Sequence, residues 1–315
     1  KGEEKNMQLF YTPQHARVGD VIPYYEDGKF HLFYLKNWNP YFGSDRKDGW
    51  HLLNTKDMVH YGPETAIGIL GGTGSVIKAD GIYHLYYCVF EQNPQRQYVC
   101  HATSRDLDSW TKHEEETFGP DETIYLPTDW RDPYVFWNEE ENCWWMIFAA
   151  QKKGKTTRRG CVGLCKSKDL HHWDYCEPFY APMNAQCAFE CPDFFRMGDW
   201  YYLVFSSYAD RYQTMYRKSR SPYGPWQTPE IDTFDTRAFY AAKTGSTFMT
   251  QTLEIVLNAI FDMMYGKFTD VLDATSAEAE LESHGMIIQA IRERDVEKAR
   301  KLMDEHLITS MNMFQ

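Results

Sequence analysis

The sequence lacks a surplus of basic residues. Its 315 residues include 33 lysines and arginines against 45 aspartates and glutamates, which gives a formal net charge of −12. A surface that binds nucleic acid is usually basic, so we expect no nucleic-acid partner. The part after residue 245 offers no basic surface either, because it holds six basic and twelve acidic residues.

Long apolar runs are also missing. No stretch is long and apolar enough to span a membrane, and the first residues do not show the pattern of a secretory signal peptide. We therefore expect neither a membrane partner nor secretion by this route. The sequence makes no prediction about the oligomeric state.

The eight cysteines lack the spacing of common zinc sites. Cys161 and Cys165, and likewise Cys187 and Cys191, are separated by three residues rather than two. We interpret the cysteines as free thiols in strand cores, which indicates a reducing compartment and a cytoplasmic location. Neither a metal nor another cofactor is predicted.

Tryptophan and cysteine are absent after residue 245, although the part before it holds all ten tryptophans and all eight cysteines. In the tail, apolar residues recur at helical spacing in three stripes, which begin at Phe248, Leu281 and Val296. The sequence therefore predicts two domains, residues 1–245 and 246–315, of which the second is all-α.

Two of the tail helices carry capping signals. Thr275 and Glu278 have the spacing of a capping box, and Asp295 is a good N-cap for the last helix. These residues satisfy backbone N–H groups that a helix start leaves without partners. We expect the last helix to begin directly after Asp295.

The first 245 residues contain a repeat instead. Aromatic segments of similar pattern lie at 27–34, 80–87, 141–148 and 198–205, and their last residues are 53, 61 and 57 positions apart. Short aromatic and β-branched runs bounded by turns such as Asp-Gly and Gly-Asp are typical of antiparallel strands. Self-similarity at this period predicts a β-propeller with one sheet per repeat.

A second repeated element follows the aromatic segments. Three of its copies contain Asp57, Asp106 and Asp169, and an aspartate that recurs in each repeat is expected to form a turn rather than to act in catalysis. His171 and His172 lie in the same element. We expect them at the surface rather than as ligands.

Three acidic residues precede the aromatic strands of their own repeats, namely Asp20, Asp132 and Glu190. Because equivalent positions of successive blades converge on the central channel, we expect these side chains to meet at one mouth. A pair of carboxyl groups, one ionised and one protonated, commonly cleaves glycosidic bonds. For each acid the alternative is a structural role as a turn or cap residue.

The motifs around these acids resemble those of a known family. Trp-Arg-Asp-Pro at 130–133 and Phe-Glu-Cys-Pro-Asp at 189–193 resemble the Arg-Asp-Pro and Glu-Cys-Pro-Asp motifs of glycoside hydrolase family 32. Thr-Gly-Ser at 73–75 and Phe-Tyr-Ala at 239–241 resemble further segments of that family. The resemblance implies a mainly β, five-bladed propeller with four blades and the start of a fifth here, followed by the short all-α segment.

The resemblance also implies an activity. The family cleaves β-fructofuranosides with retention, so Asp20 would be the nucleophile, Glu190 the general acid and base, and Asp132 the stabiliser that binds sugar hydroxyls. The substrate would be an oligosaccharide or disaccharide, and burial or nearby carboxylates should raise the pKa of Glu190. Further residues expected to bind substrate are Trp38, Trp50, Ser75, Trp130 and Arg131.

Two alternatives stay open. The segment around Asp20, Arg-Val-Gly-Asp-Val-Ile-Pro at 17–23, departs from the Trp-Met-Asn-Asp-Pro-Asn-Gly of the family. This departure leaves room for the related family 43 propellers, which are mostly inverting and act on arabinosides and xylosides.

The second alternative comes from the tail, which resembles the end of the FCD-type effector-binding domain of bacterial GntR-superfamily regulators. The resemblance rests on Ser-His-Gly at 283–285 and on the helical segment up to Leu307. It implies a non-catalytic sensor of small molecules and a chain that fuses two unrelated pieces. The histidine that matches a metal ligand of that family is His284, but a lone histidine on an apolar helix face usually packs in a core, so no metal is predicted there.

Overall fold

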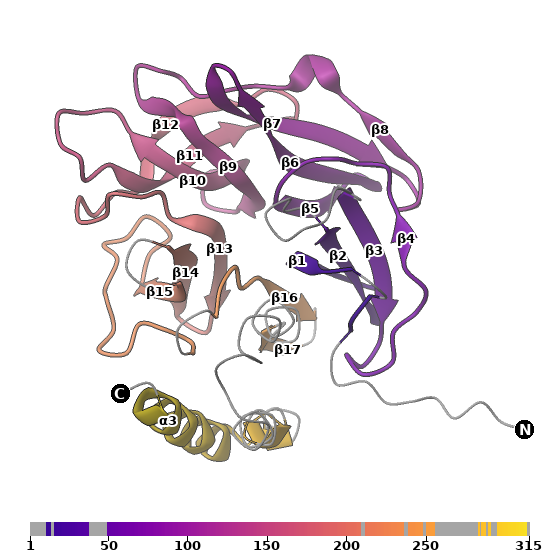
Figure 1. Cartoon of the computed structure of the whole chain (residues 1–315), viewed down its shortest axis with the longest axis vertical. Helices are drawn as coiled ribbons and strands as arrows, with labels where there is room; N and C mark the ends of the chain where they lie inside the picture. The colour runs from indigo at the N-terminus through magenta and orange to yellow at the C-terminus, as the bar shows by residue number, and fades with distance from the viewer. Residues whose placement is uncertain are drawn as a thin grey trace, which may run out of the picture.

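The structure is a computed structural model. It describes residues 11–13, 16–37, 49–208, 212–235, 239–247, 250–255, 283, 285–287, 289–290 and 295–313. Antiparallel sheets are arranged around a common centre in chain order, as the colours of Figure 1 show. The predicted mainly β propeller is therefore confirmed.

Four sheets form the blades. Blade 1 contains β1 (Val18–Glu26), β2 (Lys29–Lys36), β3 (Gly49–Thr55) and β4 (Thr65–Ala66). Blade 2 contains β5 (Gly74–Ala79), β6 (Ile82–Gln92), β7 (Gln95–Ser104) and β8 (Trp110–Lys112). Blade 3 contains β9 (Tyr125–Asn138), β10 (Cys143–Lys152), β11 (Gly160–Ser167) and β12 (Asp174–Tyr180). Blade 4 contains β13 (Glu190–Met197), β14 (Trp200–Ser207) and β15 (Gln213–Ser219).

Tight hairpins set the register inside the blades. The Asp27–Gly28 and Asp80–Gly81 turns join the first two strands of blades 1 and 2, and all four residues have positive φ. Two-residue turns of this type match the right-handed twist of the flanking strands. The predicted aromatic segments thus become the second strand of each blade.

The repeated Ser/Thr-x-Asp element forms turns, as predicted. In the third blade, the Ser167 hydroxyl accepts a hydrogen bond from the Leu170 N–H at 2.9 Å, and the Asp169 carboxylate accepts one from the His172 N–H at 2.8 Å. Blades 1 and 2 repeat this pattern at Asp57 and Asp106. Each of these aspartates therefore stabilises the turn in which it lies.

Apolar cores lie between successive blades. The core between blades 1 and 2 combines Phe33, Leu35 and Trp50 with Leu85 and Tyr87. Similar clusters join blade 2 to blade 3 and blade 3 to blade 4. Burial of large aromatic side chains supplies much of the free energy that holds such blades together.

A short fifth sheet consists of β16 (Thr244–Thr247) and β17 (Thr250–Ile255). It lies between β13 and β1 (Figure 1). The Lys243 ammonium donates to the carbonyl of Pro192 in β13 at 2.6 Å. On the other side, a Cβ on Gly245 would lie 2.9 Å from Cβ of Pro23 in β1. The start of the fifth blade therefore bridges blades 4 and 1.

The sequence predicts a helix from Phe248. This prediction is wrong over Thr250–Ile255, because these residues form the strand β17. Pairing with β16 overrides the helical spacing of the apolar residues, and the β-branched residues of this stretch suit a strand. The remaining residues of that stripe, together with Thr275, Glu278 and His284, lie outside the described residues.

The last helix is confirmed as α3 (Val296–Met313). Asp295 caps it, because its carboxylate accepts a hydrogen bond from the Lys298 N–H at 3.0 Å. His306 of α3 is buried, and its Nε2 lies 3.2 Å from Oδ1 of Asp235 in the segment after blade 4. Among the described residues, none of the helices combines the length and apolar character needed to cross a membrane.

Candidate active site

β-Bulges interrupt the first strands of blades 1, 3 and 4 at the predicted acids. The register shifts between Gly19 and Ile22, between Arg131 and Tyr134, and between Glu190 and Asp193. The first bulged residue has positive φ in every case: 46° at Asp20, 58° at Asp132 and 50° at Cys191. Bulges re-aim side chains and are frequent next to active sites.

The bulges also show how the repeats align. Each one lies opposite the last residue of a predicted aromatic segment, namely Tyr34, Phe148 or Phe205. Asp20 and Asp132 therefore occupy equivalent positions, which Cys191 takes in blade 4. Glu190 is one residue earlier and is equivalent to Arg131.

The structure brings the three predicted acids together. Burial raises the pKa of Asp20 to about 6, and the negative charges of Asp132 and Glu190 contribute to this rise. The Thr73 hydroxyl donates to the Asp20 carboxylate and, with the Lys243 ammonium, opposes the rise. The site is therefore an acidic cluster, and Lys243, which directly precedes β16, supplies a positive charge near Asp20.

Glu190 is held from two sides. Nε and Nη2 of Arg131 donate to its Oε1 at 3.1 and 2.7 Å, and the Tyr240 hydroxyl donates to its Oε2. Burial raises the pKa of Glu190, and the Asp132 charge adds to the rise, whereas Arg131 and Tyr240 lower it. The expected upward shift of this pKa is confirmed in direction.

Other polar groups fix Arg131 in turn. Its Nη1 donates to Oδ1 of Asp129 at 2.7 Å and to Oε1 of Gln97 at 3.3 Å. Asp129 also accepts from Nε2 of Gln151 at 2.8 Å. A guanidinium with partners on both sides keeps its orientation, so the position of Glu190 is preorganised.

Asp132 joins blades 3 and 4. Its Oδ2 accepts hydrogen bonds from the N–H of Cys191 at 2.9 Å and from the thiol at 3.7 Å. The side chain is buried. The Asp132 side chain thus contacts β13, the strand of the neighbouring blade that carries Glu190.

Besides Arg131, three residues expected to bind substrate are buried. Trp50 and Trp130 are fully buried, and the indole N–H of Trp50 donates to the carbonyl of Gly72 at 3.2 Å. The hydroxyl oxygen of Ser75 accepts from the Val135 N–H at 3.1 Å. Because they are buried, these side chains do not present a surface to a sugar. Trp38 lies outside the described residues.

Sequence reasoning missed three residues of the site: Thr73, Tyr240 and Lys243. They come from segments beside β5 and β16 that carry none of the predicted acids. A weak signal was present for Thr73 and Tyr240, since both belong to segments that resemble family 32. Nothing in the sequence indicated Lys243, whose position follows from the bridge between blades 4 and 1.

The prediction that the cysteines are free thiols in strand cores is confirmed in part. All eight are free thiols, and six of them are buried. Cys176 and Cys187 are only partly buried. Burial raises the pKa of Cys191 well above that of an ordinary thiol, so this neighbour of the acids stays protonated near neutral pH.

Two family models match the sequence. Residues 22–267 match the glycosyl hydrolases family 32 N-terminal domain. Residues 237–309 match the FCD domain, so the two matches overlap over the fifth sheet.

Curated relatives are similar at moderate identity. Sucrose-6-phosphate hydrolase of Escherichia coli is 27% identical over 217 residues, which cover 59% of this chain and 42% of the relative. A levanbiose-producing levanase of Bacillus subtilis is 28% identical over 205 residues, which cover 60% of this chain and 37% of the relative. The chain thus spans less than half the length of these relatives.

Solved structures share the fold. A family 32 β-fructofuranosidase of Bombyx mori superposes with a TM-score of 0.60 at 20% identity, over 76% of this chain and 55% of the other. A fructan 1-exohydrolase of Cichorium intybus in complex with 1-kestose gives 0.58 at 19% identity, over 76% and 51%. A thermostable family 43 glycoside hydrolase gives 0.55 at 13% identity, over 73% and 80%.

Proposed function

The chain belongs to glycoside hydrolase family 32 through its N-terminal domain, and we propose that it hydrolyses β-fructofuranoside-like glycosidic bonds with retention. The observation that carries this proposal is the meeting of Asp20, Asp132 and Glu190 from three blades in one cluster. Two carboxyl groups with different surroundings are what such hydrolysis requires.

Asp20 would act as the nucleophile on the anomeric carbon of the fructosyl unit. Its pKa of about 6 leaves it mostly ionised at neutral pH. The Thr73 hydroxyl donates to the carboxylate and fixes its orientation. Burial keeps the charge poorly solvated, which favours attack on a substrate carbon that develops positive charge.

Glu190 would act first as the acid and then as the base. Its raised pKa favours the protonated form that can donate to the leaving oxygen. After the fructosyl group has been transferred to Asp20, the Glu190 carboxylate would take a proton from the attacking water. Arg131 and Tyr240 stabilise this ionised form through the hydrogen bonds that they donate.

Asp132 would bind sugar hydroxyls during both steps. Among the described residues, both hydrogen bonds of its carboxylate go to Oδ2. Oδ1 can therefore accept from a hydroxyl of the fructosyl ring. Such bonds strengthen as charge develops on the sugar.

The relatives narrow the substrate class. Those matched include a sucrose-6-phosphate hydrolase, levanases and a raffinose invertase. The substrates that these names give all contain a fructosyl unit. We therefore propose a disaccharide or oligosaccharide with a terminal fructosyl group as the substrate. The free cysteines support a cytoplasmic site of action.

We also propose that the chain divides near residue 245 into a propeller and an FCD-like tail. The FCD match over residues 237–309 and the capped helix α3 support this division. In this proposal, β17 lies in the tail by sequence but pairs with β16, so the sheet that bridges blades 4 and 1 contains residues of both parts.

The test of the activity is fructose release from sucrose, raffinose and levan, measured beside an aryl arabinoside and an aryl xyloside. We expect release from fructosides only, and its loss in Asp20→Ala and in Glu190→Ala. Asp57→Ala is the control, because this aspartate acts in a surface turn. Fructose release that survives both site changes would overturn the proposal, and activity on the pentosides alone would favour the family 43 reaction.

A further inference from the structure

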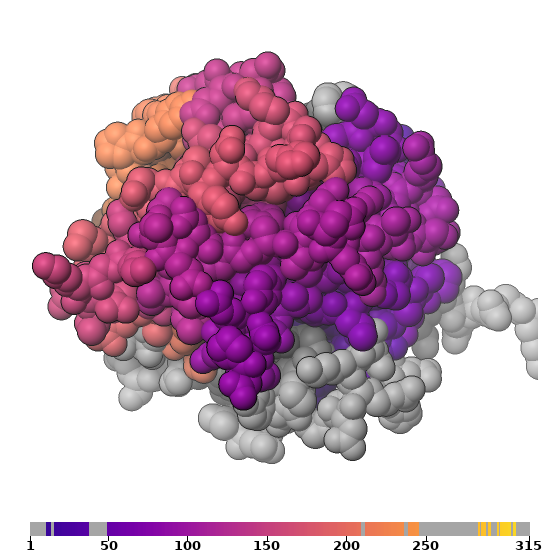
Figure 2. All heavy atoms as spheres, turned by 90° about the horizontal axis from the view of Figure 1, so that it is seen from above, coloured from indigo at the N-terminus to yellow at the C-terminus, as the bar shows by residue number. Residues whose placement is uncertain are grey.

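A cluster of imidazole and carboxylate groups lies where blade 2 meets blade 3, away from the acidic site. Figure 2 shows this side of the molecule, on which the two blades lie directly against each other. We propose that His101, Glu116 and His171 bind one divalent transition-metal ion such as Zn²⁺, which fastens the two blades together.

The three side chains converge on one point. Nδ1 of His101 lies 2.5 Å from Oε2 of Glu116, and Nδ1 of His171 lies 2.7 Å from Oε1 of the same carboxylate. The three potential ligand atoms all lie within 4.8 Å of one another. Ligands of a tetrahedral zinc ion are about 3.3 Å apart, so small side-chain movements would admit the ion.

The ligands come from both blades. His101 is in β7, and Glu116 ends the short 3-10 helix η2 (Glu114–Glu116) that follows blade 2. His171 belongs to the repeated turn of blade 3, where its N–H donates to the Asp169 carboxylate at 2.9 Å. An ion bound to all three would therefore cross-link the blades.

Neighbouring rings orient His101. Nδ1 of His84 lies 3.0 Å from Nε2 of His101, and the Tyr86 ring stacks on the His101 ring with centroids 4.5 Å apart. A histidine that binds metal usually donates its other N–H to such a partner, which fixes the ring.

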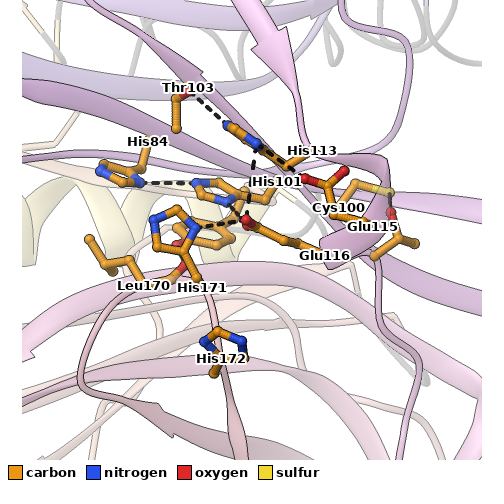
Figure 3. Close-up of polar contacts among 12 residues, drawn as sticks. His84, Cys100, His101, Thr103, His113, Glu115, Glu116, Leu170, His171 and His172 are labelled. Atoms are coloured by element: carbon orange, nitrogen blue, oxygen red, sulfur yellow. Dashed lines mark hydrogen bonds and ion pairs between the residues drawn. The ribbon is translucent and has the colours of Figure 1, made fainter.

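Solvent can reach the cluster past His171, whose side chain is 41% exposed. The fourth position of the ion would then hold water. His113 stands beside this opening, with Nδ1 4.0 Å from Oε1 of Glu116 (Figure 3). Its Nε2 is held 2.8 Å from the Thr103 hydroxyl, so Nδ1 is the atom turned toward the carboxylate.

The donor set selects the kind of ion. Two imidazoles and one carboxylate suit Zn²⁺, Co²⁺ or Ni²⁺, whereas Ca²⁺ and Mg²⁺ prefer oxygen ligands. The ligands are spread over 71 positions from His101 to His171 without a local motif. For this reason the sequence did not predict them. His171 is exposed, as expected, and the proposal revises only the expectation that it is not a ligand.

The experiment uses the full chain without an affinity tag, stripped with a chelator and titrated with ZnCl2 in a calorimeter and with CoCl2 in a spectrophotometer. We expect one ion per chain, visible Co²⁺ bands typical of a four-coordinate site, and a melting temperature that rises with Zn²⁺ concentration. MgCl2 should give neither heat nor a shift.

The matched variants are His171→Ala and His172→Ala. Figure 3 shows His172 pointing away from the cluster, and its ring pairs with Asp169 instead. We expect His171→Ala to weaken Zn²⁺ binding at least about tenfold and His172→Ala to leave it unchanged. Glu116→Gln should weaken it as well. Absence of binding, or equal affinity in wild type, His171→Ala and Glu116→Gln, would overturn the proposal.

Discussion

Arg131 and Glu190 occupy equivalent positions in neighbouring blades, and Nη2 of the first lies 2.7 Å from Oε1 of the second. The repeat thus places a cation and an acid one residue before the bulges of blades 3 and 4. Asp20 and Asp132 take the first bulged position instead. Small differences between otherwise equivalent positions give the four charged groups their distinct surroundings.

Replacing Tyr240 by phenylalanine should change the pH dependence of the reaction. The Tyr240 hydroxyl donates to Glu190 and lowers its pKa, so its removal raises that pKa further. The alkaline limb of kcat/KM against pH should therefore move to higher pH. Loss of one hydrogen bond should lower the optimal rate by about tenfold at most.

The matched control for this variant is Tyr223→Phe, since Tyr223 is exposed and follows the end of β15. Its profile should superimpose on that of the wild type. An alkaline limb that stays in place in Tyr240→Phe would show that Glu190 is not the group responsible for it.

The Lys243→Met variant should move the acid limb of kcat/KM against pH. The ammonium of Lys243 lowers the pKa of Asp20, so the variant needs a pH above 6 to ionise the proposed nucleophile. The acid limb of kcat/KM should shift upward in pH, whereas Lys112→Met, at an exposed position in β8, should leave it unchanged. A downward shift would contradict the assignment of this limb to Asp20.

Asp20→Asn should make the protein more stable at neutral pH. The pKa of Asp20 is about 6 in the folded protein and 3.8 as a model value, so ionisation opposes folding. The contribution of Asp20 to stability is therefore highest below pH 4 and falls as the pH rises from about 4 to 6. The variant should gain up to about 3 kcal/mol at pH 7 and nothing at pH 3.5.

Urea unfolding at several pH values measures this gain. Asp57→Asn is a control for which we expect the opposite change in stability. Hydrogen bonds from the ring and the N–H of His60 hold the pKa of Asp57 below its usual value, so ionisation of Asp57 favours folding. That variant should lose stability at pH 7. A loss of stability in Asp20→Asn at pH 7 would contradict the burial of an ionised carboxylate at this site.

Gly245→Ala tests the bridge between blades 4 and 1. The added Cβ would lie 2.9 Å from Cβ of Pro23, so β16 must shift away from β1. We expect a loss of about 1–3 kcal/mol in the free energy of unfolding, together with lower activity because Tyr240 and Lys243 move. Gly154→Ala, which adds a Cβ in open space, should be neutral in both assays.

The sequence allowed the blades and the acids to be predicted because both depend on local patterns. Turn residues such as Gly28 and the aromatic strands report directly on a hairpin, and Asp132 and Glu190 lie in recognisable motifs. β17 was missed because its pairing with β16 decides its conformation, which helical spacing cannot reveal.

The rest of the site depends on contacts between distant segments. Tyr240 reaches Glu190 across 50 positions, and His171 reaches Glu116 across 55. No spacing rule covers such distances, since the order of blades in the ring brings the segments together. Trp50 and Trp130 were assigned to the sugar surface from residue type alone, and their burial was visible only in the fold.

The central claim is that Asp20 attacks the sugar while Glu190 supplies and removes the proton. Mass spectrometry of the Glu190→Gln variant with an aryl β-fructofuranoside tests it most directly, because the good leaving group needs no acid whereas release of the sugar needs the base. We predict that the peptide containing Asp20 gains the mass of one fructosyl unit, and that Asp20→Asn in the same background abolishes the adduct. Fructose release without any adduct, or an adduct on another residue, would contradict the account.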